Sequence, residues 1–551
     1  MRARRYILSL LPGRQDYLWV RRTWRGDLLA GLTVGIVALP LALAFGVSSG
    51  AGAESGLITA IVAGVVAAVF GGSNVQVSGP TGAMVVVLGP IIAAHGIGVV
   101  ALVSVMAGLI VVIAGALKLG RVVSYIPWPV IEGFTLGIAA IIFLQQVPAA
   151  IGSTPGPSSN AFVAAVQSFG HIDWATVAWA VIAVTTVAVI MIVAPRVYRP
   201  LPGSIIAIVV VSVIATVAEL PLARIGALPN SLPSPELPTL EWALVNTMVA
   251  PALTIAALAA IESLLSARVA ASLSDTGPYD ADRELVGQGL ASIASGMFGG
   301  MPATGAIART AVNVRSGART RLAAIIHSAV LLGVVYLATG VVSQIPLAAL
   351  AGVLMVTATR MISVATVRSV VGSTRSDTVV FVVTALITVS FDLIVAVGIG
   401  IAVAAFFALQ ALSKSGGVHR EQLPTPAQPG DEHVALFRLD GALFFGAAER
   451  ILDRVNEISN VYVVIIRMSQ LQILDATGAR VVTEMISGLE RRGITVLLKG
   501  IQPEHLKLAI HVGVVDALRH HKHLFTDLDA AVEHARDHVL RAKAANAALA
   551  D

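Results

Sequence analysis

The chain has 551 residues, of which 56% are hydrophobic and only 13% are charged. A soluble globular chain carries about 25% charged residues, so this composition excludes an ordinary soluble protein and predicts an integral membrane protein. The formal net charge of +5 does not indicate nucleic-acid binding, because most basic residues lie in short loops beside apolar spans. The chain has no cysteine and therefore cannot form disulfides or thiolate metal sites.

A charged N-terminal segment, residues 1–27, is predicted to precede a transmembrane region at 28–412. Its apolar run before Pro12 is too short for the hydrophobic region of a cleaved signal peptide. Breaks between apolar segments predict fourteen spans. Seven are expected in the first half, at 28–46, 56–71, 77–94, 97–117, 126–150, 174–194 and 202–220. Seven more are expected in the second half, at 245–267, 284–299, 303–315, 320–342, 346–362, 376–392 and 393–412.

The loop charges test this count independently, because Lys and Arg gather on the cytoplasmic loops of membrane proteins. The loop at 219–243 contains only Arg224, and two other loops on the same side contain no Lys or Arg. Basic residues fill the opposite loops: Lys118, Arg121, Arg196, Arg199, Arg268, Arg283, Arg315, Arg319, Arg321, Arg360, Arg368 and Arg375. The pattern predicts a multi-pass protein of the inner (plasma) membrane with both termini cytoplasmic.

Two stretches of the chain repeat the same elements, FGG, then a proline, then TGA. The first is "VFGGSNVQVSGPTGAM" at 69–84, and the second is "MFGGMPATGAIART" at 297–310. Phe70 and Phe298 are 228 positions apart, which predicts an internal duplication of about 225 residues. An odd number of spans in each repeat places the halves upside down relative to each other, the architecture of many secondary transporters.

Each copy of the repeat predicts a discontinuous helix. "NVQVSGP" at 74–80 indicates a short extended segment followed by a helix that starts near Thr81, and "GGMPATGA" predicts a second helix that starts near Thr304. Two helix N-termini that face each other expose unpaired N–H groups and partial positive charge, so an anion site is expected between them. Small residues beside these starts allow a ligand to approach the backbone closely, namely Gly82, Ala83, Gly305 and Ala306.

Two ionisable residues inside predicted spans are candidates for this site. Arg309 lies five residues beyond Thr304, where a charge is costly unless it faces a cavity or a partner such as Glu262. Glu262 is a candidate for proton or sodium coupling, with a structural ion pair as the alternative. Ser266 is four residues later, on the same helix face, and is a candidate cation ligand.

The ordered motifs resemble one membrane protein family over nearly the whole chain. They are "ALPLALAFG" in the first span, "VSGPTGAM" before the third, and "ELVGQGLASIASGMFGGMPATGAIARTAVNVRSGARTRLA" across the ninth to eleventh. The chain resembles the SulP group of anion transporters, the bacterial relatives of the solute-carrier 26 proteins. The resemblance implies a homodimer in which core and gate domains move as an elevator.

The resemblance also implies roles for individual residues. Phe45 matches the first-helix aromatic beside the anion, Arg309 matches the tenth-helix arginine, and Glu262 with Ser266 match the eighth-helix acid and hydroxyl. Leu41 stands where many members have Gln. The substrate therefore stays open among sulfate, bicarbonate and a dicarboxylate such as succinate or fumarate.

The expected function is secondary active transport of a small anion. No GxxxxGK[ST] phosphate loop is present, so ATP-driven transport is not supported, and a proton or sodium ion is the expected coupling species. No catalytic constellation, cofactor motif or metal cluster predicts an enzyme. The alternatives are an anion channel or sensor, and a regulatory membrane platform.

The composition changes after Ser413. Residues 413–432 are polar and proline-rich and are predicted to be a linker. Residues 433–551 alternate strand and helix patterns, including a helix at 447–458, and predict a small cytoplasmic α/β domain. This part resembles a STAS domain, which implies a possible cytoplasmic partner. Thr477, in the turn "DATG", matches the position phosphorylated in soluble relatives. The competing interpretation is that Asp475 and Thr477 only cap a helix that begins near Gly478.

Overall fold

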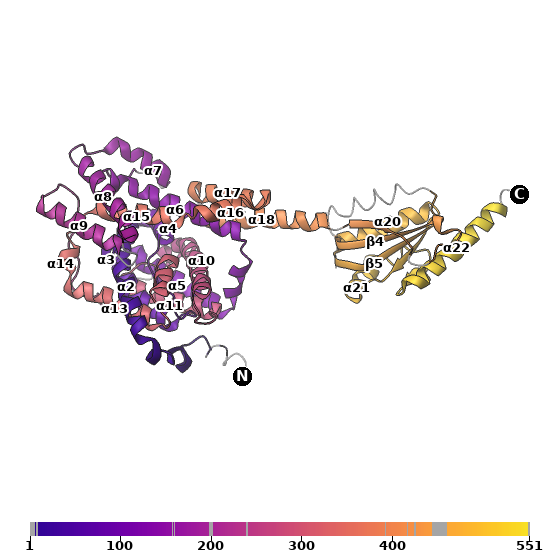
Figure 1. Cartoon of the computed structure of the whole chain (residues 1–551), viewed down its shortest axis with the longest axis horizontal. Helices are drawn as coiled ribbons and strands as arrows, with labels where there is room; N and C mark the ends of the chain where they lie inside the picture. The colour runs from indigo at the N-terminus through magenta and orange to yellow at the C-terminus, as the bar shows by residue number, and fades with distance from the viewer. Residues whose placement is uncertain are drawn as a thin grey trace. The chain divides into compact units, whose positions relative to one another are not determined.

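A computed structural model describes residues 6, 9–156, 158, 160–197, 202–238, 241–391, 393–415, 417–423, 426–443 and 460–548. The chain divides into two compact units, Met1–Ala404 and Ala405–Asp551 (Figure 1). The first is helical, and the second is built around a β-sheet.

Each of the fourteen predicted spans contains a helix. In the first half these are α2 (Val20–Ser48), α3 (Gly52–Phe70), α4 (Gly82–His95), α5 (Val99–Ala116), α6 (Trp128–Ala150), α8 (Val177–Val197) and α9 (Gly203–Val217). In the second half they are α10 (Trp242–Leu273), α11 (Ala281–Met297), α12 (Ile307–Arg315), α13 (Leu322–Leu337), α15 (Leu347–Met361), α17 (Arg375–Ser390) and α18 (Leu393–Ser415). Short helices connect some of them, namely α7 (Ala161–Ser168), α14 (Thr339–Val342) and α16 (Val364–Val371).

Within the described ranges, eight helices are long and apolar enough to cross a membrane by length and composition. Three shorter apolar helices accompany them: α4, α9 and α13. The helix α12 has nine residues, about 13 Å, which is less than half of the hydrocarbon thickness of a bilayer. The short lengths of α4 and α12 follow from the extended segments that precede them.

The two copies of the repeated motif pair with each other. Strand β1 (Ser78–Gly79) lies antiparallel to β2 (Thr304–Gly305), with Ser78 opposite Gly305 and Gly79 opposite Thr304. Helix α4 begins at Gly82, as predicted, but α12 begins at Ile307, three residues later than the predicted start near Thr304. The prediction was wrong there because Thr304 and Gly305 are taken up by the strand pair.

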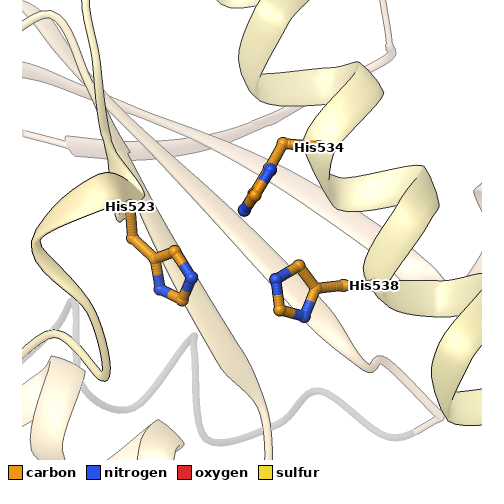
Figure 2. A group of neighbouring side chains, drawn as sticks. All are labelled: His523, His534 and His538. Atoms are coloured by element: carbon orange, nitrogen blue, oxygen red, sulfur yellow. The ribbon is translucent and has the colours of Figure 1, made fainter.

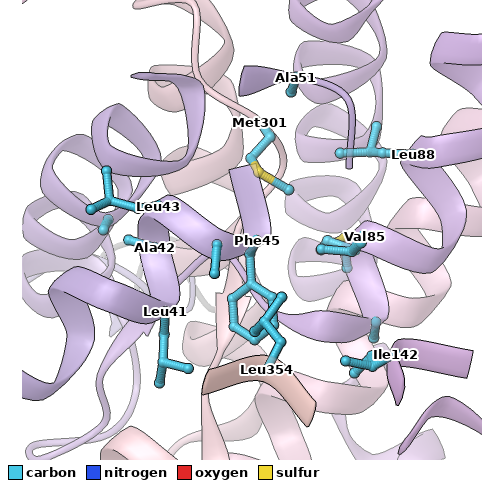
Figure 3. Close-up of a cluster of buried hydrophobic side chains, with 14 of the residues drawn as sticks. Leu41, Ala42, Leu43, Phe45, Ala51, Val85, Leu88, Ile142, Met301 and Leu354 are labelled. Atoms are coloured by element: carbon cyan, nitrogen blue, oxygen red, sulfur yellow. The ribbon is translucent and has the colours of Figure 1, made fainter. Parts of the chain in front are cut away.

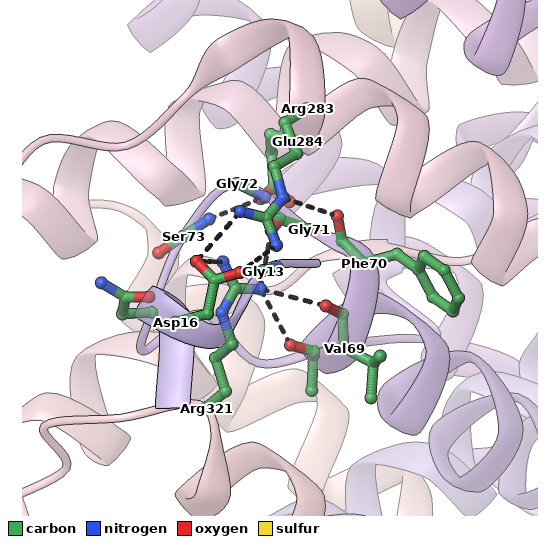
Figure 4. A network of polar contacts seen from close by, with 12 residues as sticks. Gly13, Asp16, Val69, Phe70, Gly71, Gly72, Ser73, Arg283, Glu284 and Arg321 are labelled. Carbon is green, nitrogen blue, oxygen red and sulfur yellow. Dashed lines mark hydrogen bonds and ion pairs between the residues drawn. The ribbon is translucent and has the colours of Figure 1, made fainter. Parts of the chain in front are cut away.

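The FGG turn of the first copy lies in a network of charged side chains (Figure 4). Glu284 accepts hydrogen bonds from the backbone N–H groups of Gly72 (2.8 Å) and Ser73 (3.1 Å). Arg321 donates to the carbonyl oxygens of Ala68 (3.0 Å) and Gly71 (2.6 Å), which closes the C-terminal end of α3. The turn is therefore held from one side by the Glu284 carboxyl group and from the other by the Arg321 guanidinium.

Asp16 connects the N-terminal segment to this network. Its two carboxylate oxygens accept hydrogen bonds from Arg283 at 3.0 and 2.8 Å, and Arg321 lies at 3.6 Å. Burial alone raises the pKa of Asp16, but the hydrogen bond from Arg283 and the neighbouring positive charges outweigh burial and hold the pKa below its ordinary value. The aspartate is therefore ionised at neutral pH and anchors the entry to α2.

The second unit contains a five-stranded sheet in the order β3-β4-β5-β6-β7. Strand β3 pairs antiparallel with β4, and the remaining neighbours are parallel. The strands are β3 (Gly417–Glu421), β4 (Val434–Leu443), β5 (Val463–Leu474), β6 (Thr495–Lys499) and β7 (Leu524–Phe525), and the helices are α20 (Ala476–Arg491), α21 (Pro503–His511) and α22 (Leu528–Ala548). One apolar core packs α20 and α21 on the sheet, and a second packs α22.

One sequence prediction for this unit is wrong, and a second falls on residues that the structure does not describe. Residues 417–421, expected in a polar linker, form β3, because pairing with β4 satisfies their backbone hydrogen bonds. The helix predicted at 447–458 lies outside the described residues.

Gly72 provides a test of the first FGG turn. A Cβ atom at Gly72 would lie 1.9 Å from the carbonyl oxygen of Asp280, and backbone cannot move aside cheaply. We expect Gly72→Ala to destabilise the protein by about 1–3 kcal/mol, measured as a lower unfolding temperature in detergent. Gly89→Ala is the matched control, since nothing lies within 4 Å of its Cβ position in α4. Equal unfolding temperatures for both variants would contradict a close approach at this turn.

Candidate functional site

The N-terminus of α4 is formed by Thr81, Gly82 and Ala83. Thr81 is the extended residue before the helix, and the first backbone bond of the helix runs from the Val85 N–H to the Thr81 carbonyl oxygen. The N–H groups before Val85 have no acceptor within the helix. They form the positive end of the helix dipole. The Thr81 hydroxyl does not cap the helix but donates to Glu262 Oε2 on α10 at 2.8 Å. A carboxyl group therefore lies directly beside this helix terminus.

Arg309 extends from the first turn of α12 to the start of α4. Its Nη2 donates to the Pro80 carbonyl oxygen at 2.5 Å, and the residue is only 2% exposed. Its Nη1 is buried without a hydrogen-bond partner, and no described carboxylate lies within ion-pair distance of it. Gly79 makes room for this guanidinium, since a Cβ atom there would lie 2.8 Å from Nη1. A partly unsatisfied positive charge thus adjoins the α4 terminus.

Thr304, Gly305 and Ala306 already form hydrogen bonds within the protein. The Gly305 N–H donates to Ser263 Oγ at 3.0 Å, and the Ala306 N–H donates to the Val77 carbonyl oxygen at 2.9 Å. Thr304 Oγ1 lies 2.9 Å from Ser263 Oγ. The expectation that these three residues present free N–H groups to an anion is therefore wrong for Gly305 and Ala306. The first turn of α12 runs from Ile307 to Arg309 instead.

Ser266 lies near the site and forms its described hydrogen bond with Thr310 and not with Glu262. Its hydroxyl is 3.1 Å from Thr310 Oγ1, which in turn accepts the Val77 N–H at 3.0 Å. All three groups are buried. Ser266 therefore supports the extended strand, and its proposed role as a cation ligand stays untested.

Phe45 packs against the first turn of α4 from α2. Its Cε1 lies 3.6 Å from the position of a Cβ atom on Gly82, and Figure 3 shows its ring among Leu41, Val85 and Leu354. A Cβ at Gly82 would lie 2.0 Å from Ile142 Cδ1, so glycine lets α4 sit close to both neighbours. Phe45 thus forms an apolar wall beside the helix terminus.

The sequence analysis missed Gln76, which lies in the extended segment before β1. It is buried, and neither its Oε1 nor its Nε2 has a hydrogen-bond partner among the described residues. Its Nε2 lies 1.9 Å from the position of a Cβ atom on Gly305, so the amide lies against the strand pair. An uncompensated buried amide is costly, and a glutamine inside the run "NVQVSGP" was the available signal.

A cavity of about 340 Å³ lies beside α4, but it is not at the Arg309 side chain. It is lined by the later turns of α4, from Val86 to Ile91, and by residues of α6, α10 and α17. Gln145 lines the cavity, and its Oε1 has no hydrogen-bond partner in the described part of the chain. The cavity therefore begins one to two turns along α4 from Thr81.

In the second unit, Asp475 caps the helix that contains Thr477. The Asp475 carboxylate accepts the Gly478 N–H at 2.7 Å, and α20 begins at Ala476. Thr477 is exposed in the first turn of this helix and does not provide the cap. The capping interpretation is confirmed for Asp475, while modification of Thr477 stays a prediction.

Comparison with known proteins identifies the family of the helical unit and of the C-terminal unit. A model of the sulfate permease family matches residues 24–384, and a STAS domain model matches residues 425–531. The chain belongs to the sulfate permease family. The STAS resemblance of the second unit is likewise confirmed, and the protein is a polytopic helical membrane protein with a C-terminal STAS domain.

Two bacterial relatives show how far the similarity extends along the chain. The "Putative sulfate transporter YvdB" of Bacillus subtilis is 33% identical over 502 residues, which cover 89% of this chain and 93% of the relative. The bicarbonate transporter BicA of Picosynechococcus is 32% identical over 489 residues, which cover 83% and 85%.

Solved structures give the same fold. The transmembrane domain of a cyanobacterial bicarbonate transporter BicA has 32% identity and a TM-score of 0.60, over 70% of this chain and 97% of that chain. Murine solute carrier 26 family member A9, an anion transporter in the inward-facing state, has 18% identity and a TM-score of 0.79, over 97% and 95%. The second likeness extends the fold over nearly the entire chain.

Substitution of Thr310 tests the hydrogen bond from the Val77 N–H that supports the β1–β2 pair. Thr310→Val removes the acceptor of the buried Val77 N–H, so we expect a loss of about 1–3 kcal/mol of stability. Thr310→Ser keeps the hydroxyl and should retain most of it. Thermal unfolding in detergent compares the two variants, and a valine variant as stable as the serine variant would show that this hydrogen bond is dispensable.

Proposed function

We propose that this membrane protein is a secondary active transporter of a small anion. The observation that carries the proposal is Arg309, whose buried Nη1 lacks a partner beside the N-terminus of α4. A buried guanidinium with an unsatisfied donor favours an anionic partner, and the helix dipole adds to the same attraction. The family relationship supports the same class, since transporters and not enzymes are named among the relatives.

The names of the relatives narrow the substrate to a few anions. YvdB is named for sulfate and BicA for bicarbonate. The family resemblance of the α12 segment adds a dicarboxylate such as succinate or fumarate. Leu41, in place of the glutamine common in the family, removes one polar group from α2 near Phe45. The proposal therefore includes sulfate, bicarbonate and dicarboxylate as the candidates to be tested.

Glu262 suggests how transport is coupled to a gradient. The hydrogen bond from Thr81 places its carboxyl group at the same positive helix terminus that an anion would use. An ionised Glu262 competes electrostatically with an anion, while a protonated Glu262 does not. This competition favours symport of the anion with a proton. Sodium coupling needs several oxygen ligands, and the side chains with a described hydrogen bond to Glu262 are those of Thr81 and Thr304.

The mechanism and the cellular arrangement complete the proposal. We propose an elevator-type motion, in which the helices that hold the anion move against the remaining helices. The protein is proposed to lie in the inner (plasma) membrane as a homodimer, with both termini in the cytoplasm. The alternation of basic loops supports the orientation. A cytoplasmic partner of the STAS domain belongs to the same proposal.

Uptake by purified protein in liposomes tests the proposed function. Labelled sulfate, bicarbonate, succinate and fumarate are offered in turn, with an imposed proton or sodium gradient. We expect saturable uptake of one anion that a proton gradient stimulates. Anion currents without coupled uptake would favour a channel. An absence of flux for all four anions, in protein that is folded and inserted, would contradict the proposal.

Arg309 should be required for anion affinity. We expect Arg309→Ala to weaken anion binding by about 10–100-fold, because it removes a charged donor of about 1.5–3 kcal/mol. Arg309→Lys should recover part of the affinity, since it keeps the charge but loses the planar fork. Arg315→Ala, an exposed arginine at the other end of α12, is the control. Binding measured by equilibrium titration that is unchanged in Arg309→Ala would reject this role.

Glu262 should set the pH dependence of transport. Glu262→Gln resembles the protonated state at every pH, so anion binding should no longer weaken as the pH rises. At high pH the variant should bind the anion more tightly than the unsubstituted protein, while proton-driven accumulation is lost. Binding and uptake are measured across pH 5–9. A variant that retains the original pH profile would exclude Glu262 as the coupling acid.

A further inference from the structure

Three histidines come together in the second unit, away from the proposed anion site. His523 ends the short 3₁₀ segment His521–His523, just before β7, while His534 and His538 lie one turn apart on α22. Each offers a ring nitrogen, and these nitrogens all lie within 4.8 Å of one another. Figure 2 shows the three rings around a common space between the loop and the helix.

Two buried nitrogens in this cluster have no partner. His523 is 4% exposed, and its Nδ1 is buried without a hydrogen bond, as is Nε2 of His534. A buried polar atom without a partner costs about 1–3 kcal/mol. Two such atoms in one cluster are not explained by packing of the rings on Phe525 and on each other. A positively charged ligand that accepts both lone pairs would remove this cost.

The orientations of the three imidazole rings allow their nitrogens to point toward a common centre. The His523 ring is inclined by 62° to that of His534 and by 85° to that of His538, with centroids 5.6 and 5.4 Å apart. His534 and His538 have centroids 4.9 Å apart and an angle of 62°. Rings inclined to one another in this way can point one nitrogen each at a common centre. Rings stacked in parallel could not do so.

We propose that His523, His534 and His538 form a binding site for a divalent transition metal ion, with Zn²⁺ as the favoured ion. Imidazole nitrogens suit Zn²⁺, Cu²⁺, Ni²⁺ and Co²⁺, whereas Mg²⁺ and Ca²⁺ require oxygen ligands. Two histidines at i and i+4 on a helix, with a third from a separate segment, form a tripod for a four-coordinate ion. Water can occupy the fourth position.

Binding requires only a modest closure of the three rings. At a Zn–N distance of about 2.0–2.1 Å, nitrogens in a tetrahedral site are about 3.3 Å apart. The three nitrogens, now up to 4.8 Å apart, must approach by up to about 1.5 Å, which side-chain rotation can supply. The bound ion would connect the start of β7 to α22 across the edge of the sheet. Metal binding would therefore stabilise the second unit.

The test uses the full-length protein in detergent, purified with a tag that contains no histidine and treated with a chelator. Zn²⁺ is then titrated by calorimetry, and Co²⁺ binding is followed by its visible absorption. We expect one Zn²⁺ per chain and a tetrahedral Co²⁺ spectrum, because three imidazoles and one water give four-coordination. The double variant His534→Gln with His538→Gln should weaken binding by about 100-fold or more.

His511→Gln is the matched control, because His511 is exposed on α21 and outside the cluster. The control should bind Zn²⁺ like the unsubstituted protein, and Zn²⁺ should raise the unfolding temperature of both but not of the double variant. If the double variant does not fold, X-ray absorption of the Zn²⁺-loaded original protein decides, with about three nitrogens expected at 2.0–2.1 Å. Oxygen-dominated ligation, or equal metal binding by the folded double variant, would overturn the proposal.

Discussion

Extended backbone inside the membrane-spanning unit must be hydrogen-bonded by the protein itself, and the rest of the site depends on how this is achieved. The chain pairs β1 with β2 and adds hydroxyl acceptors at the ends of this short ladder. Ser263 accepts the Gly305 N–H, and Thr310 accepts the Val77 N–H. Because the pair joins the segments before α4 and α12, it determines where both helices begin. The position of the Arg309 guanidinium, on α12, follows from those starting points.

Positive and negative groups lie close together at the N-terminus of α4, and their charges determine the electrostatics of the site. The Arg309 guanidinium and the α4 dipole are both positive, so each raises the cost of burying the other. The Pro80 carbonyl oxygen satisfies one nitrogen of Arg309, and the Glu262 carboxyl reaches the same region through Thr81. No described carboxylate lies within ion-pair distance of Arg309, although the Glu262 carboxyl is close enough to interact with its charge. An anion at the α4 terminus would therefore meet a guanidinium that is not already held in an ion pair.

Hydrophobic segments and loop charges were sufficient to predict the helical membrane unit, because span length and cytoplasmic charge follow from the bilayer. The repeated FGG and TGA elements located both helix breaks. Sequence could not predict that Thr304 and Gly305 join a strand, since two-residue ladders carry no periodicity. Likewise, the spacing of His534 and His538 can be read on one helix, but His523 approaches them only after the sheet has formed. Contacts between distant segments required the structure.

The two copies of the repeated FGG element are stabilised by different side chains. The first FGG turn is held by the Glu284 carboxyl group and the Arg321 guanidinium. The second is held by neutral hydroxyls: Thr59 accepts the Met301 N–H at 2.8 Å, and Ser295 donates to the Met301 carbonyl oxygen at 2.7 Å. A turn needs partners for its backbone N–H and C=O groups, and charged groups and hydroxyls can both supply them. The same FGG element is therefore held by a carboxyl group and a guanidinium in its first copy and by hydroxyl groups in its second.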